Sequence, residues 1–271
     1  MNKMNKKIGF IGCGKMAQAM IGGLIESNVI EKHQIYVSAR SNETLVKVKD
    51  LYNVHTLNSN IDLAMQVDYL FLAVKPDLYP TIIEDIKEVV SSNTVIITIA
   101  AGITLEGVEK SFGKEVKIVR TMPNTPSLVR EGMSALCHNQ VVSNEELSEV
   151  MEIFNSFGKC ELVNEKLMDA IPAVSGSSPA YVYLMIEALA DGAVLQGIKR
   201  DQAYKLAAQA VLGAAKMVLE TELHPGELKD QVCTPGGATI EAIAELEKRG
   251  FRSSIISAME RCTEKSVSLG K

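Results

Sequence analysis

The first 163 residues alternate short apolar runs with amphipathic stretches. Six of the runs have the length and the Val/Ile/Leu content of strands: residues 8–11, 34–38, 69–74, 95–99, 117–121 and 134–138. Strands that are buried on both faces of a parallel sheet appear as continuous apolar runs, and the helices that connect them appear as the amphipathic stretches. The pattern therefore predicts an α/β domain with a doubly wound parallel sheet.

The sequence changes character after about residue 164. Ala, Leu, Met, Glu and Lys dominate, and long segments such as 181–195 and 202–219 fit helical spacing. We expect a first domain of residues 1–163 and an all-helical second domain of residues 164–271. Segment 181–195 carries only Glu187 and Asp191 as charges, so it predicts a helix that must be buried. We expect a second copy of the chain to cover it, and a central helix of a monomeric bundle is the alternative.

Composition narrows the class of protein. The length of 271 residues suits two domains, and 46% hydrophobic with 23% charged residues is ordinary for a soluble globular protein without a membrane span. Residues 1–7 are basic, but they lead into a glycine motif and not into an export signal. The five cysteines are widely spaced and lack a C-x-x-C pair, which argues against disulfides and zinc and favours the cytoplasm.

Charge and histidine spacing point to small-molecule chemistry. The net charge is -5 and the lysines are dispersed, so the chain has no basic stripe for nucleic acid. The four histidines show no metal-ligand spacing, and we assign no metal site. A small-molecule substrate is therefore the partner that we expect, besides further copies of the chain.

A glycine motif follows the first predicted strand. Gly12, Gly14 and Ala17 form G-x-G-x-x-A, with Lys15 and Met16 inside it, where a helical pattern begins. The first glycine permits a tight turn, the second lets a pyrophosphate approach the backbone, and the small third residue allows close packing. In this setting the motif indicates a Rossmann-type dinucleotide site. Glycines that only end a strand are the structural alternative.

The end of the second predicted strand indicates which dinucleotide binds. An NAD enzyme would place Asp or Glu there, whereas this chain has Ser38, Ala39, Arg40 and Ser41. A guanidinium with neighbouring hydroxyls suits a ribose 2'-phosphate. We expect NADPH, with NADH possible. The alternatives are that Arg40 is a solvated loop charge and that Glu43 supplies the acid in a shifted loop.

Two later strand ends have small residues. Ligands of open α/β sheets lie beyond the carboxyl ends of the strands. The residues expected to line the ribose and nicotinamide there are Ala73, Val74, Lys75, Pro76, Ala100, Ala101 and Gly102. For Lys75 we favour a phosphate or ribose contact, or a cap on the strand end, over a role as catalytic acid. The rigid turn at 122–126 faces the same crevice and brings Asn124 to it.

Two loops of the helical half are unusual for a helical bundle. Ser177 and Ser178 precede Pro179, and a serine cap followed by proline already explains Ser178 structurally. What else this loop does is left open by the sequence.

The second loop, residues 234–240, places two glycine amides and two hydroxyls at the start of a helix. A substrate carboxylate would find N–H groups and the helix dipole at Gly236 and Gly237. The Thr239 hydroxyl would then reach an atom beside the carboxylate. Simple N-capping by Thr234 or Thr239 is the alternative.

In order along the chain, these motifs resemble those of the pyrroline-5-carboxylate reductase family over nearly the whole length. The matching segments are residues 12–17, 73–76, 101–103, 120–126, 174–181 and 224–240, of which 235–240 is the most specific. The resemblance implies a Rossmann domain followed by an all-α dimerisation domain, and an interleaved dimer assembled further into a decamer of five dimers. It also implies reduction of L-1-pyrroline-5-carboxylate to L-proline with NAD(P)H.

The resemblance also implies roles for single residues. Thr239 would hydrogen-bond the imine nitrogen, and Asn60 would contact the cofactor ribose. The backbone that would hold the carboxylate belongs to Thr234, Gly236, Gly237 and Ala238. The chain departs from the family at Ser178, where a glycine is usual before the proline. The serine adds bulk near the substrate pocket.

Rival functions lack residues that they need. Hydride transfer to an iminium requires mainly that two rings be oriented, and no strong acid. A 3-hydroxyacid dehydrogenase needs a lysine on a helix of the second domain, and residues 171–197 contain none. A ketol-acid reductoisomerase needs clustered carboxylates for magnesium, for which Glu187 and Asp191 are poor candidates. A non-enzymatic NADPH sensor would keep the glycine motif but have no use for a carboxylate cradle.

Overall fold

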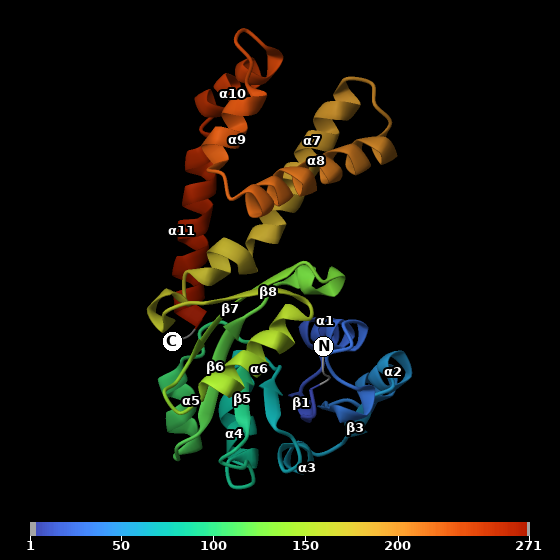
Figure 1. Ribbon diagram of the computed structural model, residues 1–271, viewed down its shortest axis with the longest axis vertical. Helices are drawn as coiled ribbons and strands as arrows, with labels where there is room; N and C mark the ends of the chain where they lie inside the picture. The colour runs from blue at the N-terminus through green and yellow to red at the C-terminus, as the bar shows by residue number, and fades with distance from the viewer. Residues whose placement is uncertain (1–3, 270–271) are drawn as a thin grey trace. The chain divides into compact units, whose positions relative to one another are not determined.

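The computed structural model describes residues 4–269 (Figure 1). The chain divides into two compact units. The first unit runs to Ser177 and takes up the chain again from Cys262, and the second unit is Ser178–Arg261. These two units are compact bodies that divide the last helix between them, so they are not the same divisions as the predicted domains. The predicted domain boundary between residues 163 and 164 stays a prediction.

In the described part of the chain, the first unit is built on an eight-stranded sheet with the order β3-β2-β1-β4-β5-β6-β7-β8. Its strands are β1 Ile8–Ile11, β2 Ile35–Ser38, β3 His55–Leu57, β4 Tyr69–Leu72, β5 Val95–Thr98, β6 Lys117–Met122, β7 Gly132–His138 and β8 Gly158–Leu162. Neighbouring strands are parallel except β6 and β7, which are antiparallel. The predicted doubly wound α/β fold is confirmed. The predicted parallel direction is wrong for β7, which runs antiparallel to β6. The connection before β7 holds only a short turn of 3-10 helix, Thr125–Val129, and a parallel crossover needs about a dozen residues or more.

Helices cover both faces of this sheet, each over its own apolar core. The helices of the first face are α1 Lys15–Glu26, α2 Asn42–Tyr52 and α6 Asn144–Asn155, and those of the second are α3 Asn60–Ala64, α4 Tyr79–Ile86 and α5 Leu105–Phe112. Successive strand residues alternate between the faces, so Phe10 and Phe71 stack in the first core while Ile11 and Leu72 enter the second. This is the layering that a ligand crevice at the strand ends requires.

The register aligns the carboxyl ends of the central strands. Ile11 of β1 pairs with Ser38 of β2 and with Leu72 of β4, and Leu72 pairs with Thr98 of β5. The segments after these strands therefore emerge at one edge of the sheet.

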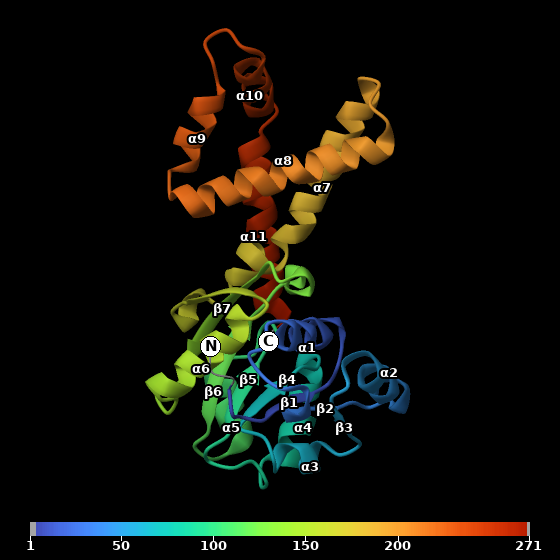
Figure 2. The same ribbon diagram turned by 45° about the vertical axis from the view of Figure 1, so that its right-hand side comes forward.

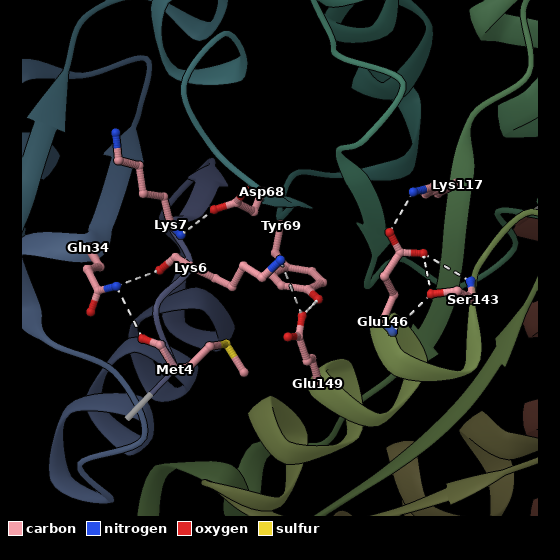
Figure 3. A network of polar contacts seen from close by, with 10 residues as sticks. All are labelled: Met4, Lys6, Lys7, Gln34, Asp68, Tyr69, Lys117, Ser143, Glu146 and Glu149. Atoms are coloured by element: carbon pink, nitrogen blue, oxygen red, sulfur yellow. Dashed lines mark hydrogen bonds and ion pairs between the residues drawn. The ribbon is translucent and has the colours of Figure 1, made fainter. Parts of the chain in front are cut away.

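A polar network lies at the opposite edge of the same sheet, where Tyr69 begins β4 and Lys117 begins β6 (Figure 3). The Tyr69 hydroxyl donates to the Glu149 carboxylate, and Lys117 Nζ donates to Glu146 Oε1 at 2.5 Å. The backbone amide of Ser143 donates to the other oxygen of Glu146 at 2.9 Å, which completes a capping box at the start of α6. Burial would raise the pKa of Glu146, but the hydrogen bonds from Lys117 and Ser143 outweigh it and lower the pKa.

The second unit is helical, as predicted. Its helices are α7 Ser178–Leu195, α8 Arg200–Thr221, α9 Pro225–Val232 and α10 Ala238–Lys248, and α11 Phe251–Leu269 runs from it into the first unit. The predicted helices 181–195 and 202–219 lie within α7 and α8, which pack against each other after a tight turn at Gly197 (Figure 2). Within the described residues, no helix is long and apolar enough to cross a membrane.

The helices of the second unit leave large apolar side chains uncovered in the single chain. Leu184 and Leu195 of α7 are 68% and 89% exposed, and α10 contains no buried residue in its described length. Exposed apolar faces of this extent mark surfaces that another chain covers.

Candidate functional site

The turn between β1 and α1 depends on two bare positions. Gly12 has φ +90°, and a Cβ placed on it would lie 2.5 Å from the carbonyl oxygen of Ala73, so only glycine fits. Gly14 is the exposed N-cap of α1 and provides no side-chain cap. Apart from its two neighbours in the chain, no heavy atom of the described residues lies within 4 Å of a Cβ built on it. The first N–H groups of α1 are thus open to an anion, while Lys15 is exposed and Ala17 packs into the core.

At the end of β2, the side chain of Ser38 contacts Asn60, which lies 22 residues later in the sequence. The Ser38 hydroxyl donates to Asn60 Oδ1 at 2.8 Å, and the Ser38 carbonyl accepts from the Gly12 amide at 2.8 Å. Ser38, Asn60 and the glycine turn therefore form one corner of the crevice.

The residues after Ser38 lie at the rim of this corner. Ser41 Oγ accepts from Thr44 N at 3.1 Å as the N-cap of α2, so its hydroxyl already has a structural task. Arg40 and Glu43 are both exposed. The preference for Arg40 as the residue that reads the 2'-phosphate remains a prediction.

The ends of β4 and β5 are tied together by a tyrosine that the sequence interpretation missed. Tyr79 is 3% exposed, and its hydroxyl donates to the Leu72 carbonyl at 2.7 Å. Burial raises the pKa of Tyr79, although hydrogen bonds with the backbone of Ile99 and Ala100 act in the opposite direction. One phenol thus holds the segments that begin with Ala73 and Ala100. The one feature of the sequence that could have indicated this role is a tyrosine within an apolar helical turn.

The remaining residues of these segments lie at the same edge. The Ala73 amide donates to the Ile11 carbonyl at 2.8 Å, and the Val74 side chain packs on Gly12. Lys75 is exposed at the N-cap of a short 3-10 helix that begins at Pro76. Ala101 is half-buried, and Gly102 has φ +79°.

Asn124 is buried and uses both ends of its amide inside the protein. Its Nδ2 donates to the Ser175 carbonyl at 2.9 Å, and its Oδ1 accepts from Met133 N at 2.9 Å. Its predicted contact with the cofactor stays a prediction, and the structure gives it a role in anchoring the short helical segment Pro172–Gly176 before Ser177. Ser177 Oγ accepts a hydrogen bond from Cys262 Sγ at 3.3 Å, and Ser178 opens α7.

The turn between α9 and α10 has the bare helix start that a carboxylate requires. Gly237 is the N-cap of α10, and no side-chain cap satisfies the first amides within this described turn. Capping by the Thr234 or Thr239 hydroxyl, the alternative left open by the sequence, is therefore wrong. The Gly237 amide donates to the Thr234 carbonyl at 3.0 Å, and Gly236 has φ +68°. Thr239 is the second residue of α10, after the exposed Ala238.

The predicted residues thus form two groups. The predicted cofactor residues lie in the first unit, most of them at the carboxyl edge of the sheet, and residues 234–239 lie in the second unit. Ser177 ends the first unit along the chain and Ser178 begins the second.

The chain matches two family models and many known proteins. Residues 165–269 match the model for pyrroline-5-carboxylate reductase dimerisation, and residues 7–102 match that for NADP oxidoreductase, coenzyme F420-dependent. The pyrroline-5-carboxylate reductase of Escherichia coli K12 is 47% identical over 99% of this chain and 100% of its own length.

Solved structures agree with these matches. The pyrroline carboxylate reductase of Plasmodium falciparum, determined with NADP bound, is 36% identical, with a TM-score of 0.89 and 100% of both chains covered. A pyrroline-5-carboxylate reductase from Coxiella burnetii is 37% identical, with a TM-score of 0.92 over 99% of this chain and 100% of that chain.

Proposed function

Because this chain belongs to the pyrroline-5-carboxylate reductase family, we propose that it reduces L-1-pyrroline-5-carboxylate to L-proline with NADPH, the last step of proline biosynthesis. The observation that carries the proposal is similarity to named reductases over 99% of the chain, which takes in both the glycine turn of α1 and the bare start of α10. The Plasmodium relative with NADP bound supports the choice of cofactor.

The first unit fits a dinucleotide on its own geometry. The absence of a Cβ at Gly14 and the uncapped start of α1 leave room and N–H donors for a pyrophosphate, which Gly12, Lys15, Met16 and Ala17 would surround. Ser38 and Asn60 would hold the adenosine ribose, Arg40 its 2'-phosphate, and NADH would bind more weakly for lack of that phosphate. The nicotinamide half would rest on Ala73, Val74, Lys75, Pro76, Ala100, Ala101 and Gly102, with Asn124 beyond them. When bound, the cofactor supplies the hydride.

The substrate residues fit an imino acid. The uncapped amides at the start of α10, in the turn formed by Thr234, Gly236, Gly237 and Ala238, would hold the carboxylate at the positive end of α10. The Thr239 hydroxyl would hydrogen-bond the ring nitrogen and relay a proton to it from water. No strong acid is needed, because hydride addition neutralises the positive charge of the iminium. Ser177 and Ser178 would line the same pocket, with Ser178 narrowing it relative to a glycine.

The dimerisation model and the exposed apolar faces of α7 indicate a homo-oligomer. We extend this to a decamer of five dimers, and we divide the chain at residue 163 into a cofactor domain and a dimerisation and substrate domain. The five cysteines, all within the described residues, are unpaired, and burial raises the pKa of the Cys13 and Cys137 thiols to about 12. Unpaired thiols support our assignment to the cytoplasm.

Removal of the Thr239 hydroxyl tests the proposed chemistry. The wild type should oxidise NADPH when pyrroline-5-carboxylate is added, and Thr239→Ala should lower kcat/KM for the imine by about 100-fold, as expected for loss of a group that orients the reacting atom. The matched control is Thr221→Ala, which removes an exposed helical threonine of the same unit whose hydroxyl donates to Met217 O. Unchanged kcat/KM in Thr239→Ala would refute the assigned role. NADPH binding by the wild type without turnover would favour a sensor.

A further inference from the structure

A buried arginine in β6 gathers two carboxylates from a later part of the chain. Arg120 is 5% exposed, and its Nη2 donates to Asp169 Oδ1 at 2.6 Å while its Nη1 lies 3.4 Å from Glu165 Oε1. Both acids belong to residues 164–177, here named the exit segment, which leads from β8 toward Ser178. Only the guanidinium is buried, since the Glu165 and Asp169 side chains are 35% and 43% exposed, and its desolvation offsets part of the attraction to the two carboxylates.

Glu165 makes a second contact, with the start of α5. Its Oε1 accepts from the Leu105 amide at 2.8 Å. Leu105 is the first residue of α5, so this amide has no acceptor inside its own helix, and a carboxylate is favoured there by the helix dipole. Residues 100–104 directly precede it, and the first three of them, residues 100–102, belong to the wall proposed for the nicotinamide. Glu165 therefore fixes the start of the helix that follows this wall.

The far end of the exit segment is also held by the residues that follow β6. Asn124, four residues after Arg120, donates to the Ser175 carbonyl at 2.9 Å. Between these two anchors, Met168 packs into the apolar core of the second face. The exit segment is thus attached to β6 at one end and to the turn after β6 at the other, and it carries Ser177.

We propose that Glu165 and Arg120 are positioning residues for hydride transfer, because they hold loop 100–104 and the exit segment in one fixed arrangement. The proposal rests on the proposed function. Neither residue is assigned a contact with cofactor or substrate. A misplacement of reacting groups by about 1 Å costs on the order of 100-fold in rate, so loosening this network should affect the chemical step more than ground-state binding.

The test compares two glutamates that each pair with a cation of β6. Glu165→Ala should lower kcat about 10- to 100-fold, change KM for NADPH less than about 3-fold, and increase the primary isotope effect with NADPH deuterated at the transferred position. Glu165→Gln should recover most of the loss, since its amide oxygen still accepts from Leu105. The control is Glu146→Ala, which removes the partner of Lys117 at the opposite edge of the sheet (Figure 3) and should leave kcat within about 2-fold.

Wild-type kcat and isotope effect in Glu165→Ala would overturn the proposal, as would equal losses in Glu165→Ala and Glu146→Ala without recovery by Glu165→Gln. If Glu165→Ala does not fold, Asp169→Asn replaces it, with an expected loss in kcat of about 3- to 10-fold, and wild-type kcat there is equally decisive.

Amide hydrogen exchange separates this proposal from the proposed function. Exchange at residues 100–105 should be faster in Glu165→Ala than in Glu146→Ala, whether or not the imine is a substrate, and equal exchange would contradict the positioning role. Absence of turnover in the wild type would instead contradict the proposed function.

Discussion

At the residue scale, the crevice depends on where side chains are missing. Gly12 lacks a Cβ because its φ of +90° and the Ala73 carbonyl leave no place for one. Gly14 lacks one although the described protein around it has room. The first glycine serves the fold and the second is free to serve a ligand, so the two should respond differently to the same substitution.

Gly14→Ala should therefore weaken cofactor binding without weakening the fold. We expect Kd for NADPH, measured by fluorescence titration, to rise about 10-fold or more because the new methyl group keeps the pyrophosphate from the backbone. The thermal midpoint should stay within about 2 °C of the wild type. Gly12→Ala is the matched variant, and it should lower the midpoint as well because of strain at φ +90°. Wild-type affinity in Gly14→Ala would refute a pyrophosphate site at this turn.

Some site residues could be predicted at this scale and others could not. The glycine turn and the 234–240 turn are local motifs whose chemistry is visible within a few residues. Tyr79 and Glu165 act through contacts with the ends of other elements: Tyr79 reaches the Leu72 carbonyl, and Glu165 reaches the Leu105 amide 60 residues away. Only the fold brings such groups together, and a single tyrosine or glutamate has no distinctive pattern around it.

At the element scale, the central strands were predictable and the edge strands were not. β1, β2, β4, β5 and β6 are buried on both faces and therefore appear as apolar runs. β3 and β8 are the two edges of the sheet and were absent from the predicted runs. β3 has only three residues, and β8 alternates the exposed Lys159 and Glu161 with the buried Cys160. Charged residues are common on edge strands because they discourage pairing with other sheets.

The capping box of α6 yields a prediction about stability and pH. The pKa of Glu146 lies below that of an unfolded glutamate, about 4.3, so its contribution is present above that pH and is lost as the pH falls through the folded pKa. Glu146→Gln should lower the free energy of unfolding by roughly 1–2 kcal/mol at pH 7, measured in urea. The difference from the wild type should shrink below about pH 4.

Glu145→Gln is the control for this prediction. Glu145 lies in the same first turn of α6 but is exposed, so its removal should cost less than about 0.5 kcal/mol at pH 7. Equal effects of the two substitutions at pH 7 would show that the contacts of Glu146 with Lys117 and Ser143 contribute nothing specific.

At the scale of the whole molecule, the apolar helices of the second unit require a partner chain. Leu184 of α7 is 68% exposed in the single chain, and burial of a leucine side chain contributes about 1.5–3 kcal/mol. Leu184→Glu should therefore raise the dissociation constant of the oligomer at least about 10-fold, which light scattering after gel filtration would detect as a lower mass. Leu51→Glu, at a 61% exposed position of α2 in the first unit, should leave the mass unchanged.

An unchanged mass in Leu184→Glu would place the interface elsewhere than on α7. A monomeric wild type would contradict the homo-oligomer itself, and a mass other than ten chains would contradict only the decamer.

We assign the hydride donor to the first unit and the imine to the second, so a measurement of hydride transfer tests both assignments. The most direct measurement is the fate of deuterium from NADPH labelled at the transferred position of the nicotinamide, followed by mass spectrometry of the product. We predict L-proline that carries one deuterium on the ring carbon that had formed the C=N bond. Formation of unlabelled proline, or oxidation of NADPH without proline, would contradict hydride transfer to the imine.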